Sequence, residues 1–166
     1  VSRDRFGRLV NELSLEARGL DDPVLVANVA RLSTLYDGKL ALMASYRDAG
    51  AASNTALRRV MESVPVAQAR LREFRAAGAA LADARIDDVR MLLDRLATTS
   101  MEFSVVSGSR LTEEIEQAEF KLLAALDVLP PAYREPVQQT IGHLKALREG
   151  QPLRDQLFAK LYYYPT

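Results

Sequence analysis

The chain has 166 residues, with 22 Lys and Arg against 22 Asp and Glu, one His and no Cys. Zero net charge removes the basic field on which nucleic-acid binding depends. The absence of Cys excludes disulfides and thiolate nucleophiles, and a single His excludes a multi-histidine metal site. With 48% hydrophobic residues, the chain is long and apolar enough to form a folded domain.

Helix-forming residues dominate the first part of the chain, and β-branched residues are too scattered to predict strands. A first amphipathic helix is predicted over about 3–18, with a C-cap at Gly19. Its apolar face is expected to contain Phe6, Leu9, Leu13 and Ala17. The run 21–23, two aspartates and a proline, predicts the start of the next helix.

A long second helix is predicted over about 23–63, because apolar residues recur at every third or fourth position. The weak helix-forming stretch 49–53 indicates a kink or a break, and Pro65 indicates the end of the helix. A third helix is predicted over 66–99. Its apolar stripe changes register near Arg85 and Asp88, which indicates a bend, a stutter or the start of a new helix capped by Asp87 or Asp88.

The last third of the chain contains clearer helix boundaries. Residues 101–106 either extend the third helix or connect it to the next one. The run 112–115 predicts a helix start with an acidic first turn, and the helix then continues to Pro130. Two further helices are predicted over about 131–149, closed by Gly150, and over 152–163.

The expected fold is therefore all-α, an antiparallel up-down helical bundle with long helices. Residues 1–166 are expected to form a single domain, with two stacked helical modules of about 1–100 and 101–166 as the alternative division.

No arrangement of residues in the sequence indicates catalysis, a metal or a cofactor. His143 has no second His and no Glu three positions before it, so a half-buried structural role is expected. The glutamates at 113, 114, 116 and 119 recur at helical spacing, which is typical of a solvated face. The chain is not expected to be an enzyme.

Five polar residues on or near the apolar stripes form the candidate ligand-binding set. They are Tyr46, Arg47, Asn54, Arg85 and Asp88. Buried polar groups lower stability unless they are paired, so such residues often line a cavity between helices. The alternative is that these side chains extend to solvent or are satisfied by neighbours.

Two segments carry a resemblance to a known family. Within 39–65, the Tyr46-Arg47 step is followed by Gly50-Ala51, by Thr55-Ala56 and by a proline at 65. Within 143–166, a helix containing His143 is followed by Pro152-Leu153-Arg154-Asp155, by leucines and by a terminal Pro-Thr. The chain thereby resembles the double all-helical ligand-binding sensor domains of bacterial histidine kinases.

The resemblance implies the periplasmic domain of an inner-membrane two-component sensor kinase, acting in signal transduction. Its expected partners are an unknown small molecule or a periplasmic binding protein, flanking transmembrane helices and a second copy in a homodimer, with no nucleic acid. The chain begins without Met and ends in Tyr162-Tyr163-Tyr164-Pro165-Thr166, as expected for a segment between two membrane helices. The alternatives are a chemoreceptor-type sensor domain and a cytoplasmic helical scaffold or adaptor.

Overall fold

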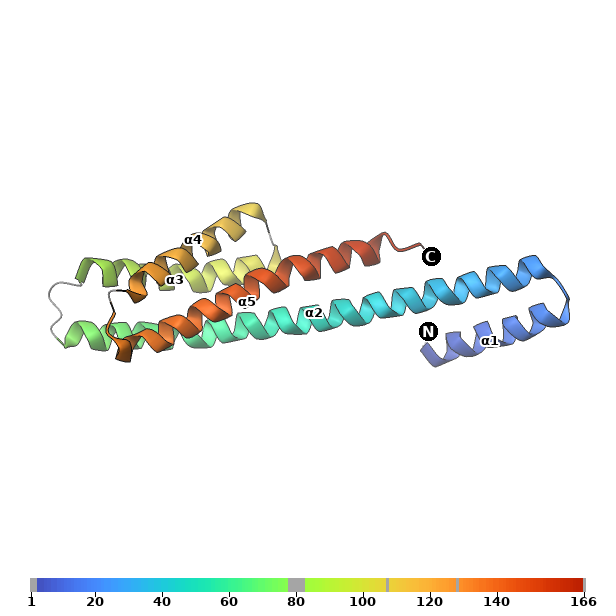
Figure 1. Cartoon of the computed structure of the whole chain (residues 1–166), viewed down its shortest axis with the longest axis horizontal. Helices are drawn as coiled ribbons and strands as arrows, with labels where there is room; N and C mark the ends of the chain where they lie inside the picture. The colour runs from blue at the N-terminus through green and yellow to red at the C-terminus, as the bar shows by residue number, and fades with distance from the viewer. Residues whose placement is uncertain (1–2, 78–82, 107, 128, 166) are drawn as a thin grey trace. The chain divides into compact units, whose positions relative to one another are not determined.

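The computed structural model describes residues 3–77, 83–106, 108–127 and 129–165, without the side chains of 3, 4 and 83–85. Five helices and no strand occur within these residues (Figure 1). The helices are α1 (Arg3–Gly19), α2 (Pro23–Ala76), α3 (Asp83–Val105), α4 (Ser109–Leu126) and α5 (Pro131–Tyr162). The predicted all-α class is confirmed.

The chain divides into two compact units, and α2 and α5 each contribute to both. The first unit comprises Val1–Tyr46 and Leu157–Thr166, and the second comprises Arg47–Gln156. Residue 100, near which a division into two modules was expected, lies inside α3 and within the second unit.

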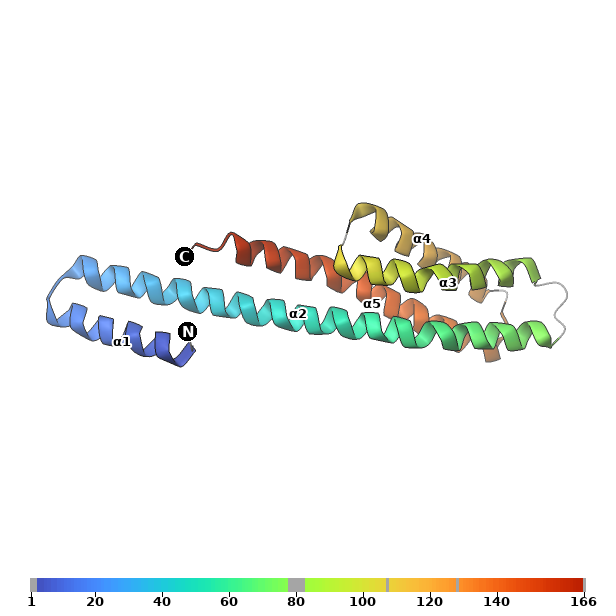
Figure 2. The ribbon, with the colours of Figure 1, turned by 180° about the vertical axis from the view of Figure 1, so that it is seen from behind.

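In the first unit, α1 runs antiparallel to the beginning of α2 (Figures 1 and 2). The turn between them places Asp21 in the left-handed region, at φ 50°. Asp22 then caps α2, because its Oδ1 accepts hydrogen bonds from the backbone N–H groups of Val24 (2.9 Å) and Leu25 (3.1 Å). The helix start predicted at 21–23 is therefore confirmed.

The core of the first unit is small. Val10, Ala17 and Val29 are its buried apolar residues, and the rings of Phe6 and Tyr36 stack with centroids 3.9 Å apart. Of the face predicted for the first helix, Leu9 and Leu13 are exposed, because the contact stripe on α1 passes through Val10 instead.

Gly38 allows a close approach in the first unit. The hydroxyl of Tyr164 lies against the α2 backbone where a Cβ on residue 38 would stand. Glycine lowers helix stability at an interior position, so this contact gives a physical reason for its presence in α2.

In the second unit, the later part of α2 joins α3, α4 and the earlier part of α5 in an up-down four-helix arrangement (Figure 2). One continuous core of twenty buried apolar residues lies among the described parts of these helices. The largest of its side chains that are almost entirely buried are Phe103, Leu71, Leu93, Leu96, Ile115, Leu122, Leu144 and Leu147. The antiparallel up-down order predicted for the bundle is observed here.

The predicted end of the second helix at Pro65 is wrong, because α2 continues to Ala76. Pro65 is exposed, while its neighbours Val64 and Ala67 are buried in the core. Proline removes one backbone hydrogen bond, but burial on both sides of it holds the chain in the helix. The stretch 49–53 is also helical throughout, so no break occurs there.

A single helix over 66–99 is likewise wrong. The segment is split between α2, which ends at Ala76, and α3, which begins at Asp83. Residues 78–82, on which part of this prediction falls, lie outside the described residues. A new helix does begin in this region, but it starts at Asp83, so the predicted cap at Asp87 or Asp88 is wrong, because both residues lie inside α3. Residues 101–105 extend that helix.

The helix start predicted at 112–115 lies one turn too late. α4 begins at Ser109 after an extended Gly108, and its first turn contains no acidic residue. The Thr112 hydroxyl donates to the Gly108 carbonyl oxygen (3.1 Å) within that turn instead of capping the helix.

The two helices predicted for 131–149 and 152–163 are one continuous helix, α5, with Pro152 inside it. Buried Gln151 explains this continuity. Its Oε1 accepts a hydrogen bond from the Ser53 hydroxyl (2.6 Å), and its Nε2 donates to the Ser104 carbonyl oxygen (3.1 Å). These tertiary bonds hold α5 between α2 and α3 at the point where local propensity favours a break.

Candidate functional site

A groove with a volume of about 530 Å³ lies between α3 and α4 in the second unit. Apolar residues dominate its lining, and three charged residues accompany them. The lining residues are Asp88, Val89, Met91, Leu92, Arg95, Phe120, Lys121, Ala124 and Ala125.

The groove follows from the antiparallel packing of α3, which ends at Val105, and α4, which begins at Ser109. Val89 and Ala125 are buried in the core, and the small side chains of Ala124 and Ala125 leave space in the groove that Leu92 also lines. The side chains of Met91 (58% exposed) and Phe120 (73% exposed) also line the groove. Large apolar side chains with such exposure commonly mark a binding surface when they gather around a hollow.

The three charged side chains that line the groove form no ion pair within the described residues, whereas the adjacent Asp87 does. Within the described residues, Asp88, Arg95 and Lys121 have neither an ion pair nor a side-chain hydrogen bond. By contrast, Asp87 accepts from Arg75 (2.8 Å) and also pairs with Arg90 (3.5 Å). The groove therefore offers one carboxylate and two cations to an external group.

The groove is suited to binding by apolar contact and charge. No group of three or more potential metal ligands occurs among the residues that the structure describes. Nor does the lining pair a nucleophile with a base, the arrangement that covalent catalysis requires.

The five residues predicted from the sequence as a ligand site have different surroundings. Tyr46 is half-buried and packs against Phe158, with ring centroids 5.9 Å apart. Arg47 is exposed, and its Nε lies 3.4 Å from Oδ1 of the adjacent Asp48. Asn54 is exposed on α2. Asp88 is also exposed, but it lines the α3–α4 groove.

Arg85, the fifth predicted residue, belongs to α3, and its side chain lies outside the described part of the structure. Asp88 is thus the one member of the predicted set with a described place in the groove.

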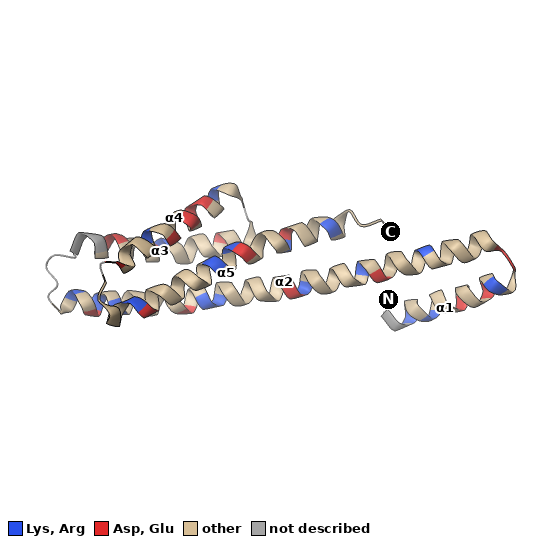
Figure 3. Ribbon diagram, viewed as in Figure 1, with Lys and Arg blue, Asp and Glu red and all other residues tan. Residues whose placement is uncertain are grey.

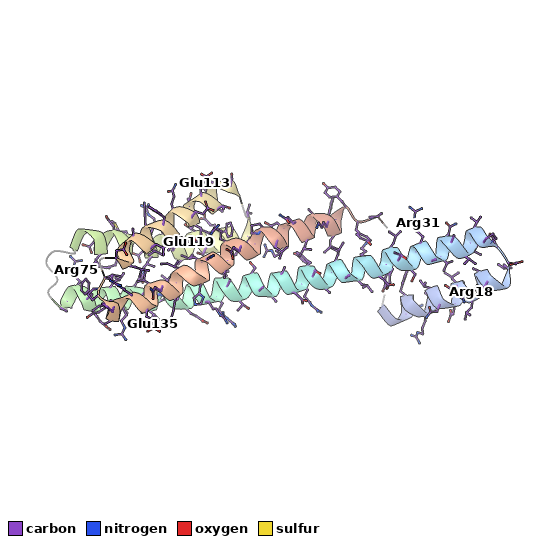
Figure 4. The ribbon with its side chains drawn as sticks, viewed as in Figure 1. Arg18, Arg31, Arg75, Glu113, Glu119 and Glu135 are labelled. Carbon is purple, nitrogen blue, oxygen red and sulfur yellow. The ribbon has the colours of Figure 1, made fainter. Side chains whose placement is uncertain are left out.

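The acidic stripe on α4 is solvated only in part. Glu113 points away from α5, whereas Glu119 lies on the side toward it (Figure 4). Glu119 accepts hydrogen bonds from Arg148 Nε (3.1 Å) and Nη2 (3.3 Å), and Glu116 accepts from Nη1 of the same guanidinium (3.1 Å). The bond to Glu119 raises the pKa of Arg148, although burial acts in the opposite direction. This cluster joins α4 to α5.

His143 is half-buried, as predicted. It lines a small hollow of about 210 Å³ between α2 and α5 together with Glu62, Ser63 and Gln139.

The groove residues that the sequence analysis missed are Met91, Arg95, Phe120 and Lys121. One signal was available for them. Phe120 is an aromatic residue off the leucine stripe of its helix, between Glu119 and Lys121. Which helix would lie beside that ring could not be deduced without the packing of α3 on α4.

Charges of both signs are interspersed along the helices (Figure 3). Among the described helices, none combines the length and the hydropathy required to cross a membrane.

Comparison with known proteins gave no match, since no family model, no curated protein and no solved structure is significantly similar to this chain.

Proposed function

We propose that the chain is a non-enzymatic sensor domain, the periplasmic part of a membrane-bound histidine kinase, with the α3–α4 groove as its input site. The continuity of two helices carries this proposal. α2 (54 residues) and α5 (32 residues) run unbroken through Pro65 and Pro152, and each contributes to both units. A continuous helix can carry a displacement from one unit to the other.

The groove lies in the second unit, and the sensing step is a change in the packing of that unit. A small molecule, or a periplasmic protein loaded with one, favours one of two packings of the bundle. The resemblance of segments 39–65 and 143–166 to the double all-helical sensor domains supports the same role. In the parent protein, a homodimer passes the displacement through flanking membrane helices to the kinase.

An adaptor that binds a partner helix is the second candidate. Phe120 and Leu123 are both exposed on α4 and three residues apart, a spacing that suits contact with an amphipathic helix. A chemoreceptor-type sensor domain shares the sensing mechanism and differs only in the signalling module of the parent protein.

The sensing step can be tested with spin labels at Ser45 on α2 and Ala159 on α5, which are both exposed and both in the first unit. Compounds that raise the melting temperature of the chain are first selected from a metabolite library. Double electron–electron resonance then measures the distance between the labels with and without each compound. We expect the distance distribution to shift for compounds that bind in the groove, and Phe120→Glu to abolish both binding and shift.

Binding in the groove without any change in the label distance would contradict a sensor role and favour the adaptor. The coding sequence around the chain provides a separate test. Membrane-spanning segments on both sides and a kinase core downstream are expected, whereas a stop codon without any membrane span would contradict the periplasmic location.

A further inference from the structure

The α3–α4 groove has a polarity along its length. Asp88 and Arg95 are seven residues apart on α3, which is two helical turns or about 10 Å along the axis. Lys121 adds a second cation from α4. A carboxylate on a ligand is therefore attracted toward Arg95 and Lys121 and repelled from Asp88.

The floor between these charges is apolar. Val89, Leu92, Ala124 and Ala125 line it, and Met91 and Phe120 stand beside it. Such a surface gains from contact with a hydrocarbon chain but offers a polar molecule no hydrogen-bond partner along its length.

We propose that this groove binds a linear amphipathic carboxylate of medium chain length, an inference that rests on the proposed role of the groove as input site. The carboxylate lies between Arg95 and Lys121, and the hydrocarbon chain crosses the floor toward Asp88. Charge complementarity favours this occupant, because both cations lack an ion pair within the described residues. The volume of about 530 Å³ is within the range of small-molecule sites.

The separation of Asp88 and Arg95 along α3, about 10 Å, favours a chain of about the size of octanoate. An extended octanoate ion is comparable in length to the separation of Asp88 and Arg95 along α3. The Asp88 carboxylate at the far end selects against dicarboxylates and fixes the direction in which the ligand lies.

The four methionines of the chain provide a direct measurement. They are Met43, Met61, Met91 and Met101, and Met91 alone among them lines the groove. The whole chain, labelled with ¹³C at the methionine methyl groups, is titrated with octanoate below its micelle concentration. We expect a saturable shift of the Met91 methyl signal, with little change in the other three.

Charge dependence is tested with variants and with ligands of matched length. We expect Arg95→Gln and Lys121→Gln each to weaken octanoate binding about threefold, and the double variant about tenfold, because each exposed cation contributes modestly. Lys145→Gln is the matched control, since Lys145 is exposed on α5 and does not line the groove. Arg95→Lys keeps the charge and should retain most of the affinity.

Three outcomes would overturn the proposal. If octylamine or octanol bound as tightly as octanoate, Arg95 and Lys121 would not be selecting for a carboxylate. An equal effect of Lys145→Gln would show only a general dependence on net charge. Concentration-dependent dimerisation that Phe120→Glu abolishes would assign the groove to a second copy.

Failure of this inference is distinguishable from failure of the proposed function. If octanoate does not bind but another compound binds and shifts the distance between the labels at 45 and 159, the sensor role remains and the ligand class is wrong. If octanoate binds through Arg95 and Lys121 but the label distance is unchanged, the ligand class remains and the sensor role is wrong.

Discussion

At the scale of single residues, the second unit combines an apolar core with a small polar layer near the end of α3. Ser53, Ser100 and Gln151 are all buried in it. Ser53 and Gln151 satisfy each other, whereas the Ser100 hydroxyl has no hydrogen-bond partner among the described residues. Burying an unpaired hydroxyl lowers stability, so the two serines are expected to contribute with opposite signs.

We expect Ser100→Ala to raise the free energy of unfolding by about 1 kcal/mol, because it removes an unpaired buried group. Ser53→Ala should lower it by about 1–2 kcal/mol, because Gln151 Oε1 then loses its donor. Urea unfolding measures both variants against the unchanged chain, with a constant m-value as the check on two-state behaviour. Equal destabilisation by the two substitutions would mean that the Ser100 hydroxyl is hydrogen-bonded.

At the scale of elements, α2 and α5 continue through prolines that local rules treat as helix ends. Pro65 lacks the N–H that would bond to the Met61 carbonyl oxygen, yet α2 extends a further eleven residues to Ala76. The core contacts of Val64, Ala67 and Leu71 hold this continuation in place.

Pro65→Ala is expected to raise the free energy of unfolding by up to about 3 kcal/mol, since alanine restores the hydrogen bond and removes the clash of the proline ring. Pro131→Ala is the matched control. It should be near neutral, because Pro131 is the first residue of α5, where proline fits the helix. Thermal unfolding followed by circular dichroism compares the two. Stability unchanged by Pro65→Ala would indicate that a bend at this position is needed by the native packing.

At the scale of the whole molecule, the two units differ in the size of their cores. Among the described residues, the first unit buries three apolar side chains in its core, and the second buries twenty. Burial of apolar surface is the main stabilising term in folding, so the units should differ in resistance to local opening.

We expect the amide hydrogens of α1 to exchange with solvent faster than those of α3 and α4. Hydrogen–deuterium exchange followed by mass spectrometry measures this on the whole chain. Deletion of residues 1–22 should change the exchange of 86–126 very little, because no described side chain of α1 belongs to the core of the second unit. Equal protection of α1 and α4 would contradict the difference between the two cores.

The candidate site shows which part of a groove a single sequence can predict. Asp88 was found because it lies near an apolar stripe, whereas Arg95 and Lys121 lie on faces that look solvated in either helix alone. They line one groove because α3 and α4 pack antiparallel with a particular register. Helical periodicity carries no information about the register between two helices.

The sequence by itself determined the all-helical class and the capped start of α2 at Asp22. Those features depend on propensity, capping and periodicity, which act within a few residues. Only the tertiary structure decided that α2 passes Pro65 and that α5 passes Pro152. Both depend on contacts with other helices, whose free energy exceeds the local preference of a proline to end a helix.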